Sequence, residues 1–354
     1  MPLNVGLIGT GNIAPAYIKG SSHFPDDVKV IACADVLPDR AAAFAGQFGL
    51  RASSVEALLA APDIDIVINL TVPAVHAEVS QQILAAGKHC YSEKPFALNR
   101  EDGRKILALA AEKGLKVGCA PDTFLGAGGR TARKAIDDGL IGKPTSAVAF
   151  MLSGGPESWH PNPFFFFQYG GGPVLDMAPY YLTWLVNLLG PVAQVGAMAG
   201  RAKAERVAGH ETIRGQRVPV DIDTHTTGVL RFESGAIGTV VFSFDVQAGT
   251  LPRIEIYGVE SSLQVPDPNT FGGDVLLWDR DQRQWANVAP VGRPDIQRGV
   301  GVADMARAIR DGGSFRASGE LAYHVLDIML SLADSAASGS FVTLESRVDR
   351  PDAV

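Results

Sequence analysis

Short apolar runs alternate with helical stretches through the first third of the chain. The runs are 5–8, 28–34, 64–70, 89–92 and 115–118, and the stretches between them are 15–19, 39–48, 55–60, 76–86 and 100–113. This alternation is typical of βαβ units that join into a parallel sheet. Asn99 suits the N-cap of the last helix, and Gly114 suits its C-cap. The pattern predicts an α/β domain with a doubly wound parallel sheet over residues 1–122.

The order of predicted strands and helices changes after residue 143. Strands are predicted at 145–152, 192–199, 224–232, 236–245, 253–257 and 275–278, and helices at 176–189, 300–311 and 320–338. Because short turns join several of these strands, we expect a large, mainly antiparallel sheet in an α+β domain over residues 123–354. The helices would cover one face and leave the other open. An open face predicts a homodimer or homotetramer formed through this sheet.

Composition and charge restrict the class of partner. The chain has 354 residues, which is too long for one ordinary core and suits two domains. A net charge of −7 argues against nucleic acid or an anionic membrane as the partner, because both require a basic face. No apolar run reaches the roughly 18 residues that a membrane span needs. We therefore expect a small-molecule ligand.

The cysteines and histidines also carry information. Cys33, Cys90 and Cys119 are odd in number, lie in predicted strands and form no Cys-x-x-Cys pair. They are typical of small buried residues in a reducing compartment, and the N-terminus shows no export segment, so we expect a cytoplasmic protein. The seven histidines form no pair with the spacing of metal ligands, so we expect no metal site.

A glycine turn follows the first predicted strand. Gly9 allows a tight turn, Gly11 lets a pyrophosphate approach the backbone, and Ala14 permits close packing of the next helix. Asn12 and Ile13 lie inside this turn and are counted as cofactor contacts. The pattern is weak by itself, because simple strand-to-helix turns also use glycine.

Asp35 ends the second predicted strand and strengthens this interpretation. It follows Ala14 by 35 − 14 = 21 residues, the distance at which a carboxylate can bind both ribose hydroxyls. It would repel a 2′-phosphate, and Val36 and Leu37 supply no positive charge. Arg40 could reach a 2′-phosphate, although a solvated helix face is its expected place. The sequence predicts a Rossmann domain that binds NAD in preference to NADP.

Glu93-Lys94-Pro95 follows the fourth strand, at the edge of a parallel sheet where ligands bind. Oxidation of a secondary alcohol requires a base for the hydroxyl proton while the carbon delivers hydride to nicotinamide. A lysine can act so if burial or a nearby cation disfavours its charged form. Glu93 could orient the ammonium and Pro95 would stiffen the turn. The alternative is an ordinary exposed loop lysine.

These motifs resemble a known family along nearly the whole chain. Together with Thr71-Val-Pro73 and His76, Ala86-Gly-Lys-His89, and Gly170–Gly172 leading to Leu175-Asp176, they look like the glucose-fructose oxidoreductase, inositol dehydrogenase and rhizopine-catabolism (Gfo/Idh/MocA) family. The resemblance implies a Rossmann domain, a second domain with an open sheet used for oligomerisation, and pyranose or cyclitol substrates. It also implies that Lys94 is catalytic and that Asp176 orients the substrate. Thr71, Pro73, His76, Glu93 and Lys94 are counted with the cofactor contacts, although His76 also suits a simple cap.

The chain departs from the family pattern at one position. Many members read Asp-x-Gly-x-His, whereas this chain reads Asp176-Met-Ala-Pro-Tyr180. Sugar-oxidoreducing branches can carry tyrosine there as the acid/base group. Tyr180 would share a helix face with Asp176, and an ammonium beside it would ease loss of its proton. Which of Lys94 and Tyr180 holds the transferred proton stays open, and an ordinary cap and packed helix face are the alternatives for Asp176 and Tyr180.

Two further groups are candidates for contacts with a ligand. The loop 153–172 is too long for a simple connector, and its Trp159 and His160 suit stacking and hydrogen bonding to a sugar, against a plain surface role. Asp122 and Thr123 follow the last Rossmann strand, where they would touch nicotinamide ribose or substrate, or else cap the joint between the domains. Arg298 is interpreted as structural.

The sequence therefore predicts an NAD-dependent dehydrogenase that acts on a secondary hydroxyl of a sugar, sugar derivative or cyclitol. Two alternatives stay open. One is a non-catalytic sensor that binds a dinucleotide and a sugar. The other is a glycosidase whose permanently held NAD oxidises and re-reduces the sugar ring.

Overall fold

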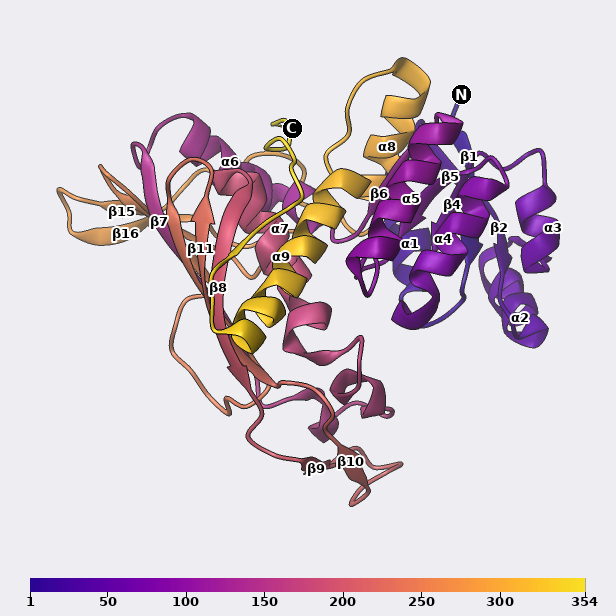
Figure 1. The fold of residues 1–354 in the computed structure, drawn as a ribbon. Helices are drawn as coiled ribbons and strands as arrows, with labels where there is room; N and C mark the ends of the chain where they lie inside the picture. Colours follow the sequence, from indigo (N-terminus) through magenta and orange to yellow (C-terminus); the bar gives the residue numbers. More distant parts are fainter. Residues whose placement is uncertain (354) are drawn as a thin grey trace. The chain divides into compact units, whose positions relative to one another are not determined.

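The computed structural model describes residues 1–353, and the main chain forms two compact units. The N-terminal unit comprises residues 1–126 and 293–326, and the C-terminal unit comprises residues 127–292 and 327–353 (Figure 1). The single boundary expected at residue 122 differs from this division, because the segment 293–326 returns to the N-terminal unit.

The N-terminal unit is built on a six-stranded sheet in the order β3-β2-β1-β4-β5-β6, and every neighbouring pair is parallel. Its strands are β1 (Leu3–Ile8), β2 (Val28–Ala34), β3 (Arg51–Ser53), β4 (Ile66–Asn69), β5 (His89–Ser92) and β6 (Val117–Cys119). The strand order reverses at β1, so the doubly wound sheet is confirmed, and the edge beside β1 and β4 is its switch point. Ile66, Val67 and Ile68 are all fully buried, as expected for a parallel sheet covered on both faces.

The helices of this unit lie close to their predicted positions. They are α1 (Ala14–Ser21), α2 (Pro38–Phe48), α3 (Val55–Ala60), α4 (His76–Ala85) and α5 (Arg100–Lys113), with short 3₁₀ turns η1 (Pro73–Val75) and η2 (Thr123–Leu125). The Asn99 side chain accepts a hydrogen bond from the Asp102 backbone N–H at 2.8 Å, which confirms the predicted N-cap. Gly114 ends α5 with φ of 64°, as a C-cap glycine does.

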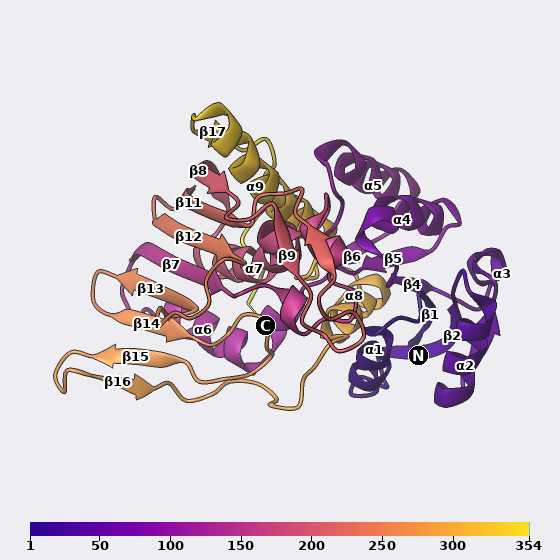
Figure 2. The ribbon, with the colours of Figure 1, turned by 90° about the horizontal axis from the view of Figure 1, so that it is seen from below.

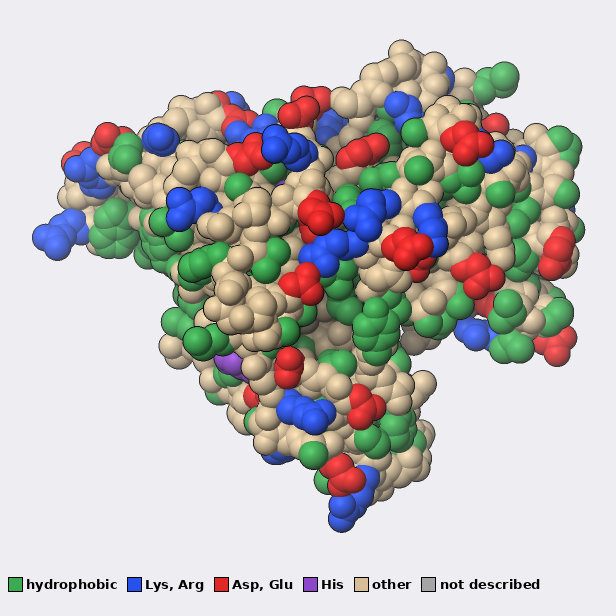
Figure 3. Space-filling model, viewed as in Figure 1, with side chains coloured by type: hydrophobic (Ala, Val, Ile, Leu, Met, Phe, Trp, Pro, Cys, Tyr) green, Lys and Arg blue, Asp and Glu red, His purple; other side chains and the backbone are tan. Residues whose placement is uncertain are grey.

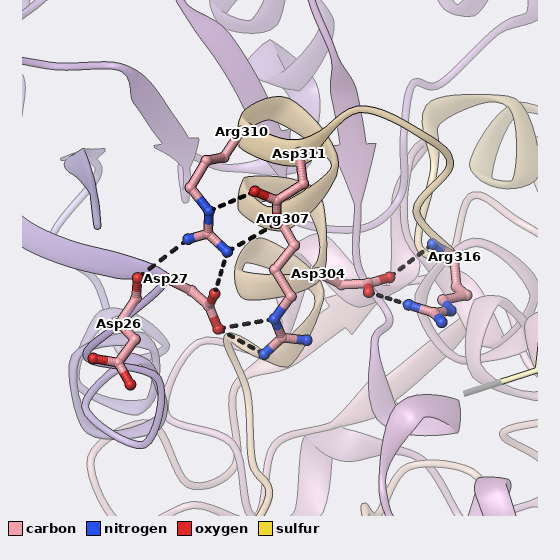
Figure 4. A network of polar contacts seen from close by, with 7 residues as sticks. All are labelled: Asp26, Asp27, Asp304, Arg307, Arg310, Asp311 and Arg316. Atoms are coloured by element: carbon pink, nitrogen blue, oxygen red, sulfur yellow. Dashed lines mark hydrogen bonds and ion pairs between the residues drawn. The ribbon is translucent and has the colours of Figure 1, made fainter. Parts of the chain in front are cut away.

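The returning segment carries α8 (Val300–Asp311) and is joined to the rest of the unit by ion pairs with the buried Asp27. Asp27 pairs with Arg307 at 2.6 Å and with Arg310 at 3.3 Å, while Asp304 pairs with Arg316 (Figure 4). Because these partners lie far from Asp27 in sequence, no local pattern predicts which unit α8 joins.

The C-terminal unit is built on a nine-stranded sheet in the order β16-β15-β14-β13-β7-β12-β11-β8-β17 (Figure 2). Its strands are β7 (Pro144–Leu152), β8 (Val192–Gly200), β11 (His225–Phe232), β12 (Ile237–Ser243), β13 (Ile254–Gly258), β14 (Ser262–Val265), β15 (Leu276–Asp279), β16 (Gln284–Asn287) and β17 (Val342–Thr343). All neighbouring pairs are antiparallel except β7 with β12, so the mainly antiparallel sheet is confirmed. The strands β9 (Glu205–Val207) and β10 (Arg217–Pro219) form a separate hairpin.

The helical elements of this unit are α6 (Ala127–Asp137), η3 (Pro156–Ser158), η4 (Phe164–Phe167), η5 (Pro173–Met177), α7 (Ala178–Leu189) and most of α9 (Gly319–Ser338). The division between the units falls within α9, after residue 326. Every residue of α7 is buried. Along β11 buried and exposed residues alternate, so one face of the sheet is packed and the other is open. No helix within residues 1–353 is long and apolar enough to cross a membrane.

The charged side chains on the face drawn in Figure 3 are mixed in sign. Lys and Arg alternate there with Asp and Glu instead of gathering into one basic area. This distribution agrees with the small excess of negative charge in the sequence.

Candidate functional site

The glycine turn after β1 uses its two glycines for different reasons. Gly9 has φ of +97°, and a Cβ atom there would lie 2.6 Å from the Leu70 carbonyl oxygen, so only glycine lets the ends of β1 and β4 pass each other. At Gly11 the nearest atom to an added Cβ is Arg40 Nη2, at 3.8 Å. The backbone at Gly11 is therefore approachable, as binding of a phosphate requires.

The turn leads directly into the N-terminus of α1. Asn12 is exposed and Ile13 is half-buried. Ile13 is the N-cap residue and makes no side-chain capping hydrogen bond, and the first turn of α1 contains no acidic residue. A helix N-terminus of this kind attracts an anion through its backbone N–H groups and its dipole.

Asp35 is held at the end of β2 by the glycine turn. Its Oδ2 accepts hydrogen bonds from the Thr10 backbone N–H and hydroxyl, both at 2.9 Å, and its Oδ1 accepts one from the Leu37 N–H at 3.0 Å. Burial raises the pKa of Asp35, but these hydrogen bonds and the charge of Arg40 outweigh it, so the pKa lies below the ordinary value. The group is a charged acceptor fixed in place.

A cavity of about 500 Å³ opens beside this carboxylate. Its lining includes Asp35, Val36, Pro38 and residues 52–56. Val36 and Leu37 are apolar yet 85% and 52% exposed. An apolar surface next to a fixed carboxylate suits the adenine and ribose of a dinucleotide.

His76 joins two loops at the same edge of the sheet. Its Nδ1 lies 2.9 Å from the Pro95 carbonyl oxygen and its Nε2 lies 2.9 Å from the Thr71 carbonyl oxygen, and the residue is 1% exposed. Burial lowers the pKa of His76, although both carbonyls favour the charged ring. A neutral ring has one N–H, so it donates to one of these carbonyls at a time. The imidazole therefore lies between the Thr71 and Pro95 carbonyl oxygens and brings the two loops together.

The turn that carries Lys94 rests on a buried carboxylate. Glu93 is 7% exposed; its Oε1 accepts a hydrogen bond from the Tyr17 hydroxyl at 2.9 Å, and its Oε2 accepts one from the Lys94 backbone N–H at 3.0 Å. Lys94 itself is half-buried, and the Lys94–Pro95 peptide is cis. Glu93 thus fixes the backbone from which the ammonium extends. The sequence did not point to Tyr17, because nothing local distinguishes it from a core tyrosine of α1.

Asp122 and Thr123 are both fully buried. Asp122 Oδ2 accepts hydrogen bonds from the backbone N–H groups of Gly299 and Gly301, each at 3.0 Å, and Arg298 Nη1 lies 3.5 Å from Asp122 Oδ1. Burial raises the pKa of Asp122, against the lowering effect of Arg298 and the two N–H groups. Asp122 therefore binds the N-terminus of the segment that carries α8, within the N-terminal unit. Its contact with nicotinamide ribose or substrate stays a prediction.

Asp176 and Tyr180 lie on one helical segment of the C-terminal unit. Asp176 is half-buried in the π-helical turn η5, and Tyr180 is 6% exposed in the first turn of α7. The expected single helix from Asp176 differs from this arrangement, because Pro179 has no N–H to continue the ladder and falls within the first turn of α7. Gly172, with φ of +82°, directly precedes η5.

The loop 153–172 presents an aromatic cluster. The His160 ring makes edge contacts with Trp159, Phe165 and Phe166 at centroid distances of 5.4, 5.7 and 5.0 Å. Trp159 is 63% exposed. The cluster therefore offers aromatic surface to solvent.

Arg206 fixes this loop and was not found from the sequence. Its side chain is 4% exposed, pairs with Glu157 at 2.7 Å and with Asp245, and lies 5.0 Å from the centroid of the Phe167 ring. These partners are distant in sequence, so no local signal marks the arginine.

A doubly wound parallel sheet with an approachable glycine turn and a fixed carboxylate at the end of β2 defines the class of Rossmann dinucleotide-binding proteins. Residues 3–120 match the model of an oxidoreductase family with an NAD-binding Rossmann fold, and residues 130–264 match the GFO/IDH/MocA C-terminal domain. The chain belongs to the GFO/IDH/MocA oxidoreductase family, which confirms the resemblance seen in the sequence. It is an NAD-binding oxidoreductase.

Named relatives match most of the chain. A 1,5-anhydro-D-fructose reductase of Ensifer adhaerens is 28% identical over 96% of this chain and 98% of its own length. A levoglucosan dehydrogenase of Pseudarthrobacter phenanthrenivorans is also 28% identical, over 96% and 97%. An inositol 2-dehydrogenase of Saccharopolyspora erythraea is 32% identical over 77% and 75%. A solved levoglucosan dehydrogenase in complex with NADH and L-sorbose superposes with a TM-score of 0.80 at 26% identity, covering 97% of this chain and 99% of the other.

Proposed function

We propose that this protein is an NAD-dependent dehydrogenase that interconverts a secondary hydroxyl and a keto group on a sugar, sugar derivative or cyclitol. The observation that carries the proposal is the Lys94 turn. Two separate supports hold it at the carboxyl end of β5: Tyr17 through Glu93, and His76 through the Pro95 carbonyl oxygen. A lysine that served only as a surface charge would need neither support.

The residues of the N-terminal unit fit the cofactor. Bound NAD supplies the hydride acceptor at nicotinamide C4. Gly9, Gly11, Asn12 and Ile13 would hold the pyrophosphate at the start of α1, and Asp35 would accept hydrogen bonds from the ribose. The loop from Thr71 to Pro73, placed by His76 and by the hydrogen bond from Thr71 Oγ1 to Asn69 Oδ1 at 2.6 Å, would flank the cofactor. Arg40, whose guanidinium lies close to Gly11, would add a positive charge near the phosphates.

The proton would pass through Lys94 and Tyr180. One of the two removes the hydroxyl proton of the substrate during oxidation and returns it during reduction, so the pair acts as acid and base. Asp176 would orient the substrate by accepting hydrogen bonds from neighbouring hydroxyls. Lys94 belongs to the N-terminal unit, and Asp176 and Tyr180 belong to the C-terminal unit.

The relatives support the class of substrate. Their names refer to 1,5-anhydro-D-fructose, levoglucosan and inositol. All three carry several secondary hydroxyls on a ring. The aromatic cluster around Trp159 and His160 agrees with such a ligand, because aromatic rings pack on the C–H faces of sugars while polar groups bind the hydroxyls.

A direct assay tests the proposal. Purified protein is mixed with NAD and a panel of hexoses, anhydrosugars and inositols, and the absorbance of reduced nicotinamide is followed. At least one compound should be oxidised. Lys94→Ala should lower kcat by roughly 100- to 10,000-fold, the usual share of a general acid or base. NAD affinity, measured by calorimetry, should change little, which separates loss of chemistry from loss of the cofactor site.

Three outcomes would contradict the proposal in different ways. Full activity of Lys94→Ala would remove the assigned mechanism. Tight binding of NAD and a sugar with no turnover in either direction would instead indicate a sensor. Release of an aglycone from a glycoside without net accumulation of NADH would indicate a glycosidase that recycles its cofactor.

We also propose that the open face of the nine-stranded sheet pairs with a second copy of the chain. Met198, Val229 and Ile237 lie on neighbouring strands and are 82%, 40% and 54% exposed. Large exposed apolar side chains on a sheet mark an interaction surface. Light scattering should give the mass of a dimer or tetramer, and Val229→Glu should lower it; a monomeric wild-type protein would exclude this assembly.

A further inference from the structure

A second cavity lies entirely within the C-terminal unit. It measures about 500 Å³, and its wall includes the glycine triplet Gly170–Gly172 that directly precedes η5. This volume falls within the range of roughly 300–1,000 Å³ that is usual for small-molecule sites. None of the roles proposed above uses this space.

The walls of the cavity combine apolar and charged groups. Leu175 and Met329 contribute aliphatic surface, while Arg201, Asp221 and Asp223 contribute charge. Two carboxylates and one guanidinium leave one net negative charge, which disfavours an anionic ligand. Carboxylates accept hydrogen bonds from hydroxyls and a guanidinium donates them. Such a lining fits a neutral ring with many hydroxyls, whose C–H faces pack on the aliphatic side chains and on Tyr169, which is 72% exposed.

The charged wall is fixed to its surroundings by the backbone. Arg201 Nη1 donates to the Val220 carbonyl oxygen at 2.5 Å, and the Asp221 N–H donates to the Phe167 carbonyl oxygen at 2.9 Å. A Cβ atom on Gly172 would lie 2.5 Å from Ile222 Cδ1, so the triplet and the charged wall are in close contact. A cavity with fixed walls binds a ligand at a lower cost in entropy than a loose loop does.

We propose that this cavity binds a second sugar ring, so that the preferred substrates are glycosides or disaccharides. The inference rests on the proposed function, because the first ring is the one that Asp176 and Tyr180 would hold. Leu175 lines the cavity and is the immediate neighbour of Asp176, which connects the two positions along the chain. A segment of a second copy of the chain is the competing occupant.

The test compares monosaccharides with disaccharides built from them. The probes are glucose and galactose against maltose, cellobiose and lactose, assayed with the intact protein and NAD. The wild-type protein should show a kcat/KM for at least one disaccharide about tenfold above that for the matching monosaccharide, equivalent to ~1.4 kcal/mol. A disaccharide that is never preferred would overturn the proposal.

Two substitutions and two matched controls locate the effect. Asp223→Asn removes a charged acceptor, and Ala199→Leu fills part of the cavity that Ala199 lines. Each should lower kcat/KM for the disaccharide about tenfold while that for the monosaccharide stays within about twofold. Asp281→Asn and Ala202→Leu make the same chemical changes at exposed positions outside the cavity and should have no effect on either substrate.

Other outcomes separate this inference from the proposed function. Equal losses for both kinds of substrate would overturn the second subsite, and a change of oligomeric mass in Ala199→Leu would assign the cavity to a second copy instead. If no sugar is oxidised, calorimetric titration of the NADH-bound protein with maltose decides the question independently. Binding that Asp223→Asn weakens would support the cavity as a sugar site, and no binding would overturn it.

Discussion

The Lys94 turn of the N-terminal unit and the loop 153–172 of the C-terminal unit are both candidates to contact a ligand, but they are held in different ways. The Lys94 turn follows β5 in a parallel sheet and is supported separately through Glu93 and through the Pro95 carbonyl oxygen. The loop 153–172 depends largely on Arg206, whose partners Glu157 and Asp245 are 49 and 39 residues away in sequence.

The difference shows how each kind of sheet provides a site. In a parallel sheet the carboxyl ends of all strands meet at one edge, so topology alone brings the turns after β1, β2, β4 and β5 together. The antiparallel sheet has no such common edge, and its long loop is bound by one buried cation, Arg206, through Gly154 and Glu157. We therefore expect damage to the first region to be specific to chemistry or cofactor, and damage to the second to be structural.

The prediction with the largest expected effect tests whether a residue of the C-terminal unit takes part in proton transfer. Tyr180→Phe should lower kcat by about 100- to 10,000-fold, because the phenol is proposed to carry the proton. Steady-state assays with NAD and an accepted sugar measure the change. Tyr181→Phe is the matched control: this neighbouring phenol is 1% exposed, and burial raises its pKa to about 12, so it should affect kcat by less than about threefold. Equal losses in both variants would refute a specific role for Tyr180.

A second prediction concerns the order of the loop 153–172. Arg206→Met should cost about 3–5 kcal/mol, because it leaves the carboxylates of Glu157 and Asp245, whose side chains are only 14% and 12% exposed, without their cation. Thermal unfolding measures the loss. Hydrogen exchange should show lost protection in the loop 153–172 and unchanged protection in the strands of the N-terminal unit.

The control for this prediction is an exposed ion pair in the same hairpin. Arg217 pairs with Glu205 at 2.6 Å, and its side chain is 78% exposed. Arg217→Met should change stability by less than about 1 kcal/mol, as is usual for surface pairs. A loss of the same size in both variants would show that the loop does not depend on Arg206.

Most helices could be predicted from the sequence, but not all of them. The helices 55–60, 100–113 and 300–311 were predicted at their observed bounds, because caps and periodicity are local. Helix α6 was missed, since Gly128 and Gly129 lie in its first turn and glycine disfavours helix. A Cβ on Gly128 would lie 2.9 Å from Pro266 Cγ, so the reason for this glycine is a contact from a remote strand end.

The residues of the candidate site likewise differ in whether a local sequence signal marks them. Gly9, Gly11 and Asp35 could be proposed as cofactor contacts from the sequence, because their spacing within one βαβ unit carries the signal. Tyr17 and Arg206 were missed because each acts on a partner that is distant in sequence. The hydrogen bonds of Asp122 could not be predicted, since its partners Gly299 and Gly301 come from the returning segment.

A third prediction separates stability from cofactor binding within the glycine turn. Gly9→Ala should destabilise the protein by about 2–4 kcal/mol, because the added Cβ meets the Leu70 carbonyl oxygen and φ is positive. Gly11→Ala has no such clash and should leave stability within about 0.5 kcal/mol while weakening NAD binding. Thermal unfolding and calorimetric titration measure the two quantities. Loss of stability at Gly11 with normal NAD affinity would reverse the assignment.

The smallest effect concerns the choice between NAD and NADP. Asp35→Asn should weaken NAD binding about tenfold, ~1.4 kcal/mol, and bring the affinities for NAD and NADP closer, because the amide no longer repels a 2′-phosphate. Asp39→Asn, in the exposed first turn of α2, should leave the ratio unchanged.

The pH dependence of Asp35 follows from the direction of its shift. The pKa of Asp35 is lowered from the ordinary 3.8, so its contribution to stability is complete above that value and is lost as the pH falls through the lower pKa of the folded protein. Between about pH 5 and 8 the carboxylate therefore stays charged. Titration of Asp35 should cause no change in NAD affinity over this range. A difference between the wild-type protein and Asp35→Asn that shrinks steadily from pH 8 to pH 5 would mean that Asp35 titrates much higher, and that the hydrogen bonds from Thr10 and Leu37 do not hold it charged.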